Sequence, residues 1–186
     1  MKRIAFVLSV LLITKVVSAQ YKPIDQGSEL KFTIKNFGFE VNGTFSGLQG
    51  SINFDPQNPG KSTFDVTIDA STVNTDNTTR DDHLKSENYF DVKNYPRIRM
   101  VSATVSGPNK TGSYIFLGQL TIKGKSKEVL IPFTATATSD GYIFKGTLEI
   151  NRKDFDVGGS STISDELEVS LNISAKKSIA WQVNNR

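Results

Sequence analysis

The sequence contains no cysteine and a single histidine, His83, among its 186 residues. Without cysteine no disulfide can support the fold, so stability must come from a hydrophobic core and from hydrogen bonds between strands. A zinc site would have only carboxylates to complete it, and the acidic residues Asp76, Asp81 and Asp82 lack the spacing of a calcium-binding loop. No G-x-S-x-G motif indicates a serine hydrolase. The residue inventory therefore favours binding over catalysis and predicts no metal site.

The sequence also lacks an apolar run long enough to span a membrane. The run from Ile4 to Ile13 is shorter than the roughly 20 residues that a helical span needs, and Lys15 follows it. It lies between Lys2-Arg3 and Val17-Ser18-Ala19, which is the pattern of a secretory signal. No cysteine follows that could carry a lipid anchor. We predict a signal peptide over residues 1–19 and an exported protein, periplasmic in a double-membraned bacterium or otherwise secreted.

An excess of positive charge is absent once this signal is removed. Three of the 22 basic residues lie in the predicted signal, which leaves 19 basic and 19 acidic residues in the mature chain. The basic surface typical of a nucleic-acid-binding protein is therefore not expected, and we predict no nucleic-acid partner.

What the chain has in abundance is alternation of apolar and polar residues. In the segment 30–35, Leu30, Phe32 and Ile34 share one face and the intervening lysines and threonine share the other. The sequence predicts about nine half-buried strands and no long amphipathic helix, with strands near 30–35, 41–45, 50–54, 64–68, 98–106, 114–122, 128–138, 142–150 and 167–175. Turn residues separate them, including Gly47 with Gly50 and the hairpin signal Asp140-Gly141.

So many antiparallel strands must close into a barrel or stack as a sandwich to hide their edges, and long strands in up-and-down order favour the barrel. A barrel of about eight strands is either filled by side chains or holds one small ligand. Seven phenylalanines are expected to point inward: Phe32, Phe45, Phe54, Phe64, Phe116, Phe133 and Phe144. From periodicity alone, filling of the core is the simpler interpretation of these residues.

One stretch interrupts the strands. It reads RDDHLKSENYFDVKNYP from Arg80 to Pro96, and we interpret it as a short helix and loop that cover one end of the barrel. His83 either hydrogen-bonds a neighbouring acid or contacts a ligand head group, with Arg80 as a second donor. Arg80 and Asp81 could equally form a structural salt bridge, and Asp91 is expected to cap a turn.

Six blocks in order resemble one known family. They read FTIKNFGFEVNGTFSGLQGSINFDP from Phe32, VTIDASTVNT from Val66, RDDHLKSENYFDVKNYP from Arg80, GQLTIKGKSKEVLIPF from Gly118, INRKDFDVGG from Ile150 and ISDELEVSLNISA from Ile163. The chain is similar to the YceI-like family of exported, polyisoprenoid-binding proteins. The resemblance implies an all-β, lipocalin-like extended antiparallel β-barrel of about eight strands over residues 20–178. It would have a short helix and loop insertion around residues 78–96 and a C-terminal tail at 179–186.

The resemblance also implies a function: non-enzymatic binding and carriage or storage of a long-chain isoprenoid lipid, polyprenyl or quinone-like, with no other cofactor. The resemblance implies that the inward phenylalanines line a ligand-binding cavity and do not simply fill the core. The expected ligand-binding residues are Phe32, Ile34, Phe45, Phe64, Arg80, His83, Phe90, Phe116, Phe133 and Phe144. An enzyme acting on a bound lipid through Arg80, Asp81 and His83, or a packed barrel used for protein contacts, remain alternatives. Whether the protein touches a membrane or forms a homodimer stays open.

Two positions depart from the family pattern. Asn36 stands where a histidine is common, and Asp156 stands where relatives tend to have glycine. If the histidine touches a head group in relatives, that contact is altered in this chain, and the turn at Asp156 is expected to differ.

Overall fold

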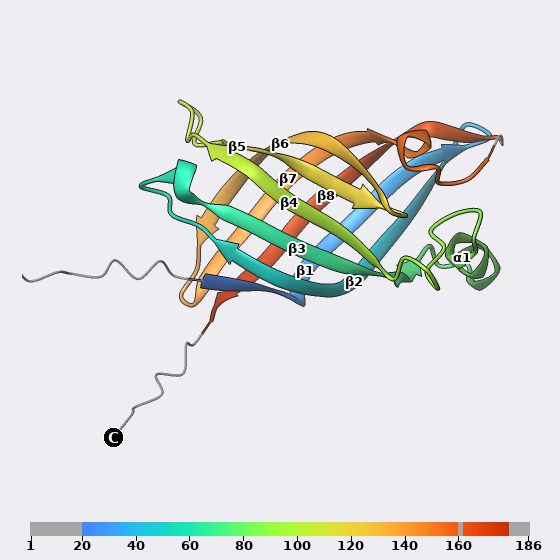
Figure 1. The fold of residues 1–186 in the computed structure, drawn as a ribbon, viewed down its shortest axis with the longest axis horizontal. Coiled ribbons are helices and arrows are strands. Elements are labelled where there is room, and N and C mark those ends of the chain that lie inside the picture. Colours follow the sequence, from blue (N-terminus) through green and yellow to red (C-terminus); the bar gives the residue numbers. More distant parts are fainter. Residues whose placement is uncertain (1–19, 160–161, 179–186) are drawn as a thin grey trace, which may run out of the picture.

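The computed structural model describes residues 20–159 and 162–178. In this part of the chain eight antiparallel strands in sequence order form one closed barrel (Figure 1). They are β1 (Gln20–Asn36), β2 (Phe39–Asn53), β3 (Thr63–Asn74), β4 (Arg97–Ser106), β5 (Tyr114–Ile122), β6 (Lys125–Ala137), β7 (Gly141–Asn151) and β8 (Ile163–Lys177). β1 pairs with both β2 and β8, so no strand edge of the sheet is left open. The predicted all-β barrel of about eight strands is confirmed.

Two predicted segments lie outside the described residues, namely the signal peptide at 1–19 and the tail at 179–186. Within the described part, no helix is long and apolar enough to cross a bilayer.

The two ends of the barrel differ. One end, here called the mouth end, carries the β1–β2 turn, the helix α1 (Thr78–Lys85) with the loop after it, the β5–β6 turn and the short helix η2 (Arg152–Phe155). Figure 1 shows α1 beside this end, on the right. Asn77 caps the helix by accepting a hydrogen bond from the Arg80 N–H at 3.0 Å, and Asp81 lies in the first turn. The predicted insertion of a short helix and loop is confirmed.

The strand count differs from nine because two predicted strands, 41–45 and 50–54, are one. β2 runs through both, and the pairing with β3 shifts register between Thr44 and Gln49. Gly47 has a φ of +72° in this irregular stretch. Asp25 of β1 accepts hydrogen bonds from the N–H groups of Gly47 and Leu48 at 3.1 and 2.9 Å. The glycines therefore make a bulge inside a strand and not a turn between two strands.

At the opposite end, here called the aromatic end, side chains fill the barrel. The ring of Phe54 lies 5.2 to 6.4 Å from five other rings, those of Phe64, Tyr114, Phe133, Tyr142 and Phe144. All five pairs are edge-to-face, a geometry that adds about 0.5–1.5 kcal/mol per pair beyond burial. Burial raises the pKa of Tyr142, so its hydroxyl stays neutral in this apolar surrounding.

Candidate functional site

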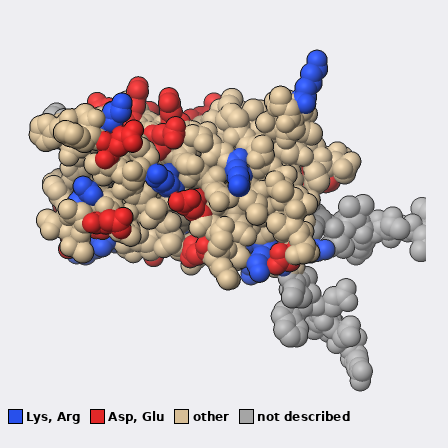
Figure 2. Space-filling model, turned by 180° about the vertical axis from the view of Figure 1, so that it is seen from behind, with Lys and Arg blue, Asp and Glu red and all other residues tan. Residues whose placement is uncertain are grey.

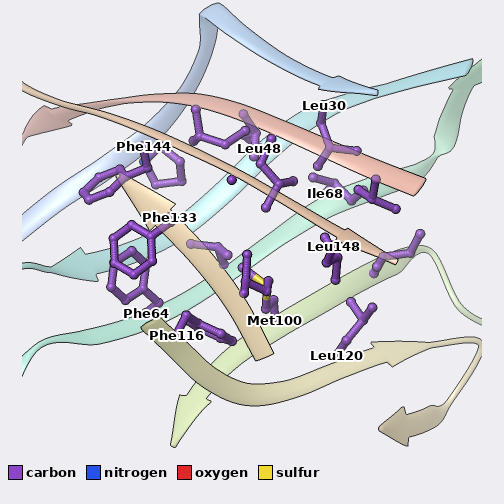
Figure 3. Close-up of a pocket in the computed structure, with 18 of the residues that line it drawn as sticks. Leu30, Leu48, Phe64, Ile68, Met100, Phe116, Leu120, Phe133, Phe144 and Leu148 are labelled. Carbon is purple, nitrogen blue, oxygen red and sulfur yellow. The ribbon is translucent and has the colours of Figure 1, made fainter. Parts of the chain in front are cut away.

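An apolar cavity of about 160 Å³, here called the bore, lies inside the barrel on the mouth side of the rings that fill the aromatic end. Side chains from most of the strands surround it, including Leu30, Leu48, Ile68, Met100 and Leu148 (Figure 3). Four of the predicted ligand-binding residues, Phe64, Phe116, Phe133 and Phe144, line its inner part. These phenylalanines thus have both roles considered for them, because they pack against one another and also form the wall of a space.

A larger space of about 590 Å³, here called the mouth chamber, lies under α1 at the mouth end. Its apolar wall includes the predicted residues Phe32, Ile34 and Phe90. Its polar lining includes the other two predicted residues of the insertion, Arg80 and His83, together with Asn36, Asn77, Thr79 and Thr162. Asn77 and Thr79 are exposed, so the chamber reaches the surface of the protein.

Phe45 lies in the wall shared by the two spaces. Phe45 and Ile98 line both the bore and the mouth chamber. The Phe45 ring lies 5.7 Å from that of Phe32 and 5.4 Å from that of Phe90. All ten predicted residues therefore line one or the other of two adjacent spaces that share Phe45 and Ile98, and the inner space, the bore, is lined almost entirely by apolar atoms.

The polar residues of α1 are held by Thr75. The Asp81 carboxylate is buried and accepts hydrogen bonds from the Thr75 N–H and hydroxyl at 2.9 and 2.6 Å. The Arg80 guanidinium donates to the Thr75 hydroxyl at 2.7 Å and to the Thr75 carbonyl at 2.8 Å. Arg80 and Asp81 thus meet through Thr75, which replaces the direct salt bridge considered from the sequence. These contacts fix the helix at the rim of the chamber.

His83 and Asp91 have contacts of different kinds. The His83 ring packs edge-on against the ring of Tyr89, with centroids 4.9 Å apart, and its side chain lines the chamber. The hydrogen bond to a neighbouring acid that the sequence suggested is replaced by this ring contact. Asp91 lies in a turn, as predicted, and its carboxylate accepts hydrogen bonds from the Asn94 amide at 3.0 Å.

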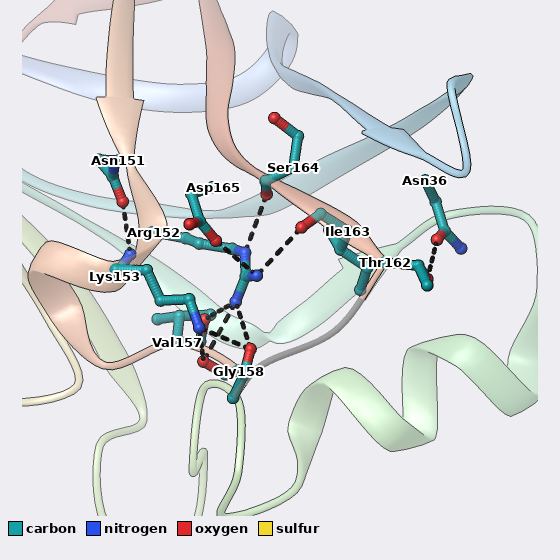
Figure 4. A network of polar contacts seen from close by, with 11 residues as sticks. Asn36, Asn151, Arg152, Lys153, Val157, Gly158, Thr162, Ile163, Ser164 and Asp165 are labelled. Carbon is teal, nitrogen blue, oxygen red and sulfur yellow. Dashed lines mark hydrogen bonds and ion pairs between the residues drawn. The ribbon is translucent and has the colours of Figure 1, made fainter.

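A buried arginine that the sequence did not reveal holds the opposite rim. Arg152 is 5% exposed and donates to the carbonyls of Val157, Gly158, Ile163 and Ser164 at 2.9 to 3.1 Å (Figure 4). It also forms an ion pair with Asp165 at 2.7 Å. Arg152 ties the segment after β7 to the start of β8, and this segment places Phe155 and Val157 in the chamber wall.

The two departures from the family pattern lie on the same rim. Asn36 accepts a hydrogen bond from the Thr162 hydroxyl at 2.9 Å, so its amide links β1 to the segment before β8 (Figure 4). Asp156 has a φ of +53°, in the left-handed region that glycine favours and aspartate tolerates. Its carboxylate pairs with Lys125, and that hydrogen bond lowers its pKa.

No group of three or more histidine, aspartate and glutamate side chains in the described residues is placed to hold a metal ion.

The family model of the YceI-like domain matches residues 21–175. The chain belongs to the YceI-like family. It is 30% identical over 167 residues to a UPF0312 protein of Yersinia enterocolitica, which covers 84% of this chain and 86% of the relative. A UPF0312 protein of Photorhabdus laumondii is 34% identical over 122 residues, 63% of this chain and 62% of the relative. The chain thus spans less than two thirds of that second relative.

Solved structures agree with the fold of this YceI-like protein. BcnA of Burkholderia cenocepacia superposes with a TM-score of 0.73 at 27% identity, over 78% of this chain and 94% of BcnA. A polyisoprenoid binding domain from Saccharophagus degradans superposes with a TM-score of 0.65 at 13% identity, over 85% and 98% of the two chains. At that identity the second likeness shows a shared barrel alone.

Proposed function

We propose that this YceI-like protein binds a long-chain isoprenoid, polyprenyl or quinone-like, and carries or stores it without chemical change. The observation that carries the proposal is the arrangement of the site, an apolar bore that shares Phe45 with a chamber whose opening carries polar groups. A ligand with a long apolar chain and a single polar end has the same asymmetry. The Saccharophagus domain with the same barrel is described as polyisoprenoid-binding, which supports this assignment.

Most of the binding free energy in this proposal comes from the apolar isoprenoid tail and little comes from its polar head group. Burial of each methylene-sized unit contributes roughly 0.8 kcal/mol, so several isoprene units need no strong polar contact. Arg80 and His83 belong to the polar lining of the mouth chamber, where a head group would lie. In this proposal the bore and the apolar wall of the chamber supply affinity, and these two side chains select the head group.

The expected place of action is outside the cytoplasm, because the sequence predicts a signal peptide over residues 1–19. A protein that shields an apolar chain from water fits an aqueous compartment next to a membrane, such as the periplasm.

A direct titration tests the proposal. Delipidated protein is titrated with prenyl alcohols of increasing chain length, and bound ligand is measured after removal of the free alcohol. We expect affinity to rise with chain length until the bore and chamber are filled. If the folded protein binds no prenyl alcohol of any length, the proposal is wrong.

The enzyme alternative can be separated from carriage by one variant. The enzyme alternative would use Arg80, Asp81 and His83. Arg80 and Asp81 are hydrogen-bonded to Thr75, whereas the contact seen for His83 is the ring contact with Tyr89. We expect His83→Ala to change head-group preference while a bound lipid is recovered unaltered from both proteins. Recovery of a modified lipid from the parent protein, and of intact lipid from His83→Ala, would instead identify an enzyme.

A further inference from the structure

The turn between β1 and β2 exposes two phenylalanines at the mouth end. Phe37 is 73% exposed and Phe39 is 77% exposed, and only Gly38 separates them. Among the described residues, the other exposed large hydrophobic side chains are Tyr95, also at the mouth end beside the β5–β6 turn, and Leu130 on the wall of β6. Exposed aromatic side chains are thus gathered at the end of the barrel where the chamber opens.

Phe37 also has a backbone conformation that is unfavourable for a phenylalanine. Phe37 and Gly38 have φ values of +50° and +83°, and Asn36 pairs with Phe39 across this two-residue turn. Such a turn requires positive φ at both central residues and strongly prefers Asn-Gly, whereas a bulky residue at positive φ is strained. The phenylalanine therefore costs stability, and its exposed ring gains little from the protein in return. A residue that breaks a local rule without a compensating contact is a candidate for function.

Phe39 continues the apolar lining of the chamber beyond the rim. Side chains two residues apart on a strand point to the same side, which places Phe39 in line with Val41 and Phe45. Val41 and Phe45 both line the chamber. The three side chains thus form an apolar path from the tip of the turn to the entrance of the bore.

The charge and size of this tip fit a membrane surface. Lys35 and Glu40 face each other across the two strands at its base and balance in charge, and no charged residue lies between them in sequence. At the left of Figure 2, the protruding part of this end shows no charged side chains, which lie farther back on the barrel. Two phenylalanines bury at most about 500 Å², less than the roughly 800 Å² per partner of a stable protein interface. Shallow insertion between lipid head groups needs no larger area.

We infer that the β1–β2 tip, Phe37 with Phe39, docks this protein on a lipid bilayer so that the mouth chamber opens toward the membrane. The inference rests on the proposed function, because docking in this orientation lets a prenyl chain pass along Val41 and Phe45 without crossing water.

Flotation with phosphatidylethanolamine–phosphatidylglycerol vesicles tests this docking on the protein beginning at Gln20, which contains the whole barrel. Phe37→Asn creates the preferred turn sequence, so we expect a higher melting temperature together with weaker vesicle binding. The double variant Phe37→Asn/Phe39→Thr is expected to lose vesicle binding by about tenfold or more. Leu130→Thr removes an exposed hydrophobic side chain elsewhere and should float like the parent.

Other results overturn the inference. It is wrong if the parent does not float, if the double variant floats as well as the parent, or if the double substitution instead abolishes self-association of the parent. Binding of prenyl alcohols of increasing chain length, each measured without vesicles, separates the docking inference from the proposed function. Prenol binding without flotation refutes docking alone, whereas tip-dependent flotation without prenol binding supports docking and refutes the proposed ligand.

Discussion

Thr75 and Asp81 are joined inside the protein by two hydrogen bonds to a single carboxylate oxygen, Oδ1 of Asp81. Both residues are buried, at 6% and 7% exposed, and the Thr75 hydroxyl also accepts a hydrogen bond from Arg80. One hydroxyl group, on the residue after β3, thus connects the barrel to Arg80 and Asp81 of α1. Helix α1 is attached to the barrel mainly by this small polar cluster, because Asp81 is its only buried residue.

Replacement of Thr75 by valine should therefore loosen the helix. Thr75→Val keeps the shape of the side chain but removes the hydroxyl, which leaves Asp81 short of one donor and Arg80 short of one acceptor. We expect the free energy of unfolding, measured by urea denaturation, to fall by about 1–3 kcal/mol. The matched change at an exposed position, Thr78→Val, should alter it by less than about 0.5 kcal/mol. A Thr75→Val protein as stable as the parent would contradict this role.

The Arg152 network gives a second prediction. Arg152→Lys keeps the charge but loses the planar set of donors that reaches several carbonyls and Asp165 at once. We expect a loss of about 2–3 kcal/mol in the free energy of unfolding.

The control for this change is Arg99→Lys. Arg99 also forms a two-point contact with a carboxylate, that of Asp65 at 2.7 and 2.8 Å, but both side chains are about half exposed. Its replacement should have a much smaller effect, because exposed ion pairs contribute little. Equal losses for the two variants would show that burial of Arg152 does not matter.

The junction at Phe45 predicts a dependence on ligand length. Phe45→Trp adds bulk where the bore meets the mouth chamber, and such overpacking typically costs about 1–3 kcal/mol. Affinity for a long prenyl alcohol, which must pass the junction, should drop about tenfold, whereas a short prenol that fits in the chamber should bind almost unchanged. Isothermal titration with both ligands measures the difference. Leu130→Trp on the outer wall should affect neither, and an equal loss for both ligands in Phe45→Trp would argue against a continuous path.

Stability should decrease in acid. Hydrogen bonds from Arg99 lower the pKa of Asp65 below its usual 3.8, and those from Lys176 do the same for the pKa of Asp140. A carboxylate whose pKa is lower in the folded state stabilises the fold above its unfolded pKa, and this contribution is lost as the pH falls through the folded pKa.

Urea denaturation at a series of pH values below about 5 measures this loss. Asp65→Asn should flatten part of the curve, by a modest amount since the Asp65–Arg99 pair is exposed. An identical pH dependence in parent and Asp65→Asn would exclude a contribution from this pair.

The sequence predicted the parts of the structure that follow from strand geometry. Alternation of period two fixes which side chains face inward, so Phe64, Phe116, Phe133 and Phe144 were placed correctly around the bore. A short helix and loop were expected in the stretch that interrupts the strands, and the structure places the helix at Thr78–Lys85.

Other features depend on partners distant in sequence. The bulge in β2 has the same glycines as a turn, and only the contacts of Asp25 with Gly47 and Leu48 distinguish the two. Arg152 gave no signal because most of its partners are backbone carbonyls, which every residue has. The importance of Phe37 follows from a positive φ combined with exposure, and neither property can be read from an apolar residue beside a glycine.

The central claim, that the barrel holds an isoprenoid, is tested most directly by mass spectrometry of an organic-solvent extract. The protein should be purified without detergent from the exported pool of its own host, because expression elsewhere would offer different lipids. We predict one prenyl species in near-stoichiometric amount, and a Phe45→Trp protein purified in the same way should carry less of it. A folded, monodisperse protein that releases no prenyl lipid from either preparation would contradict the account.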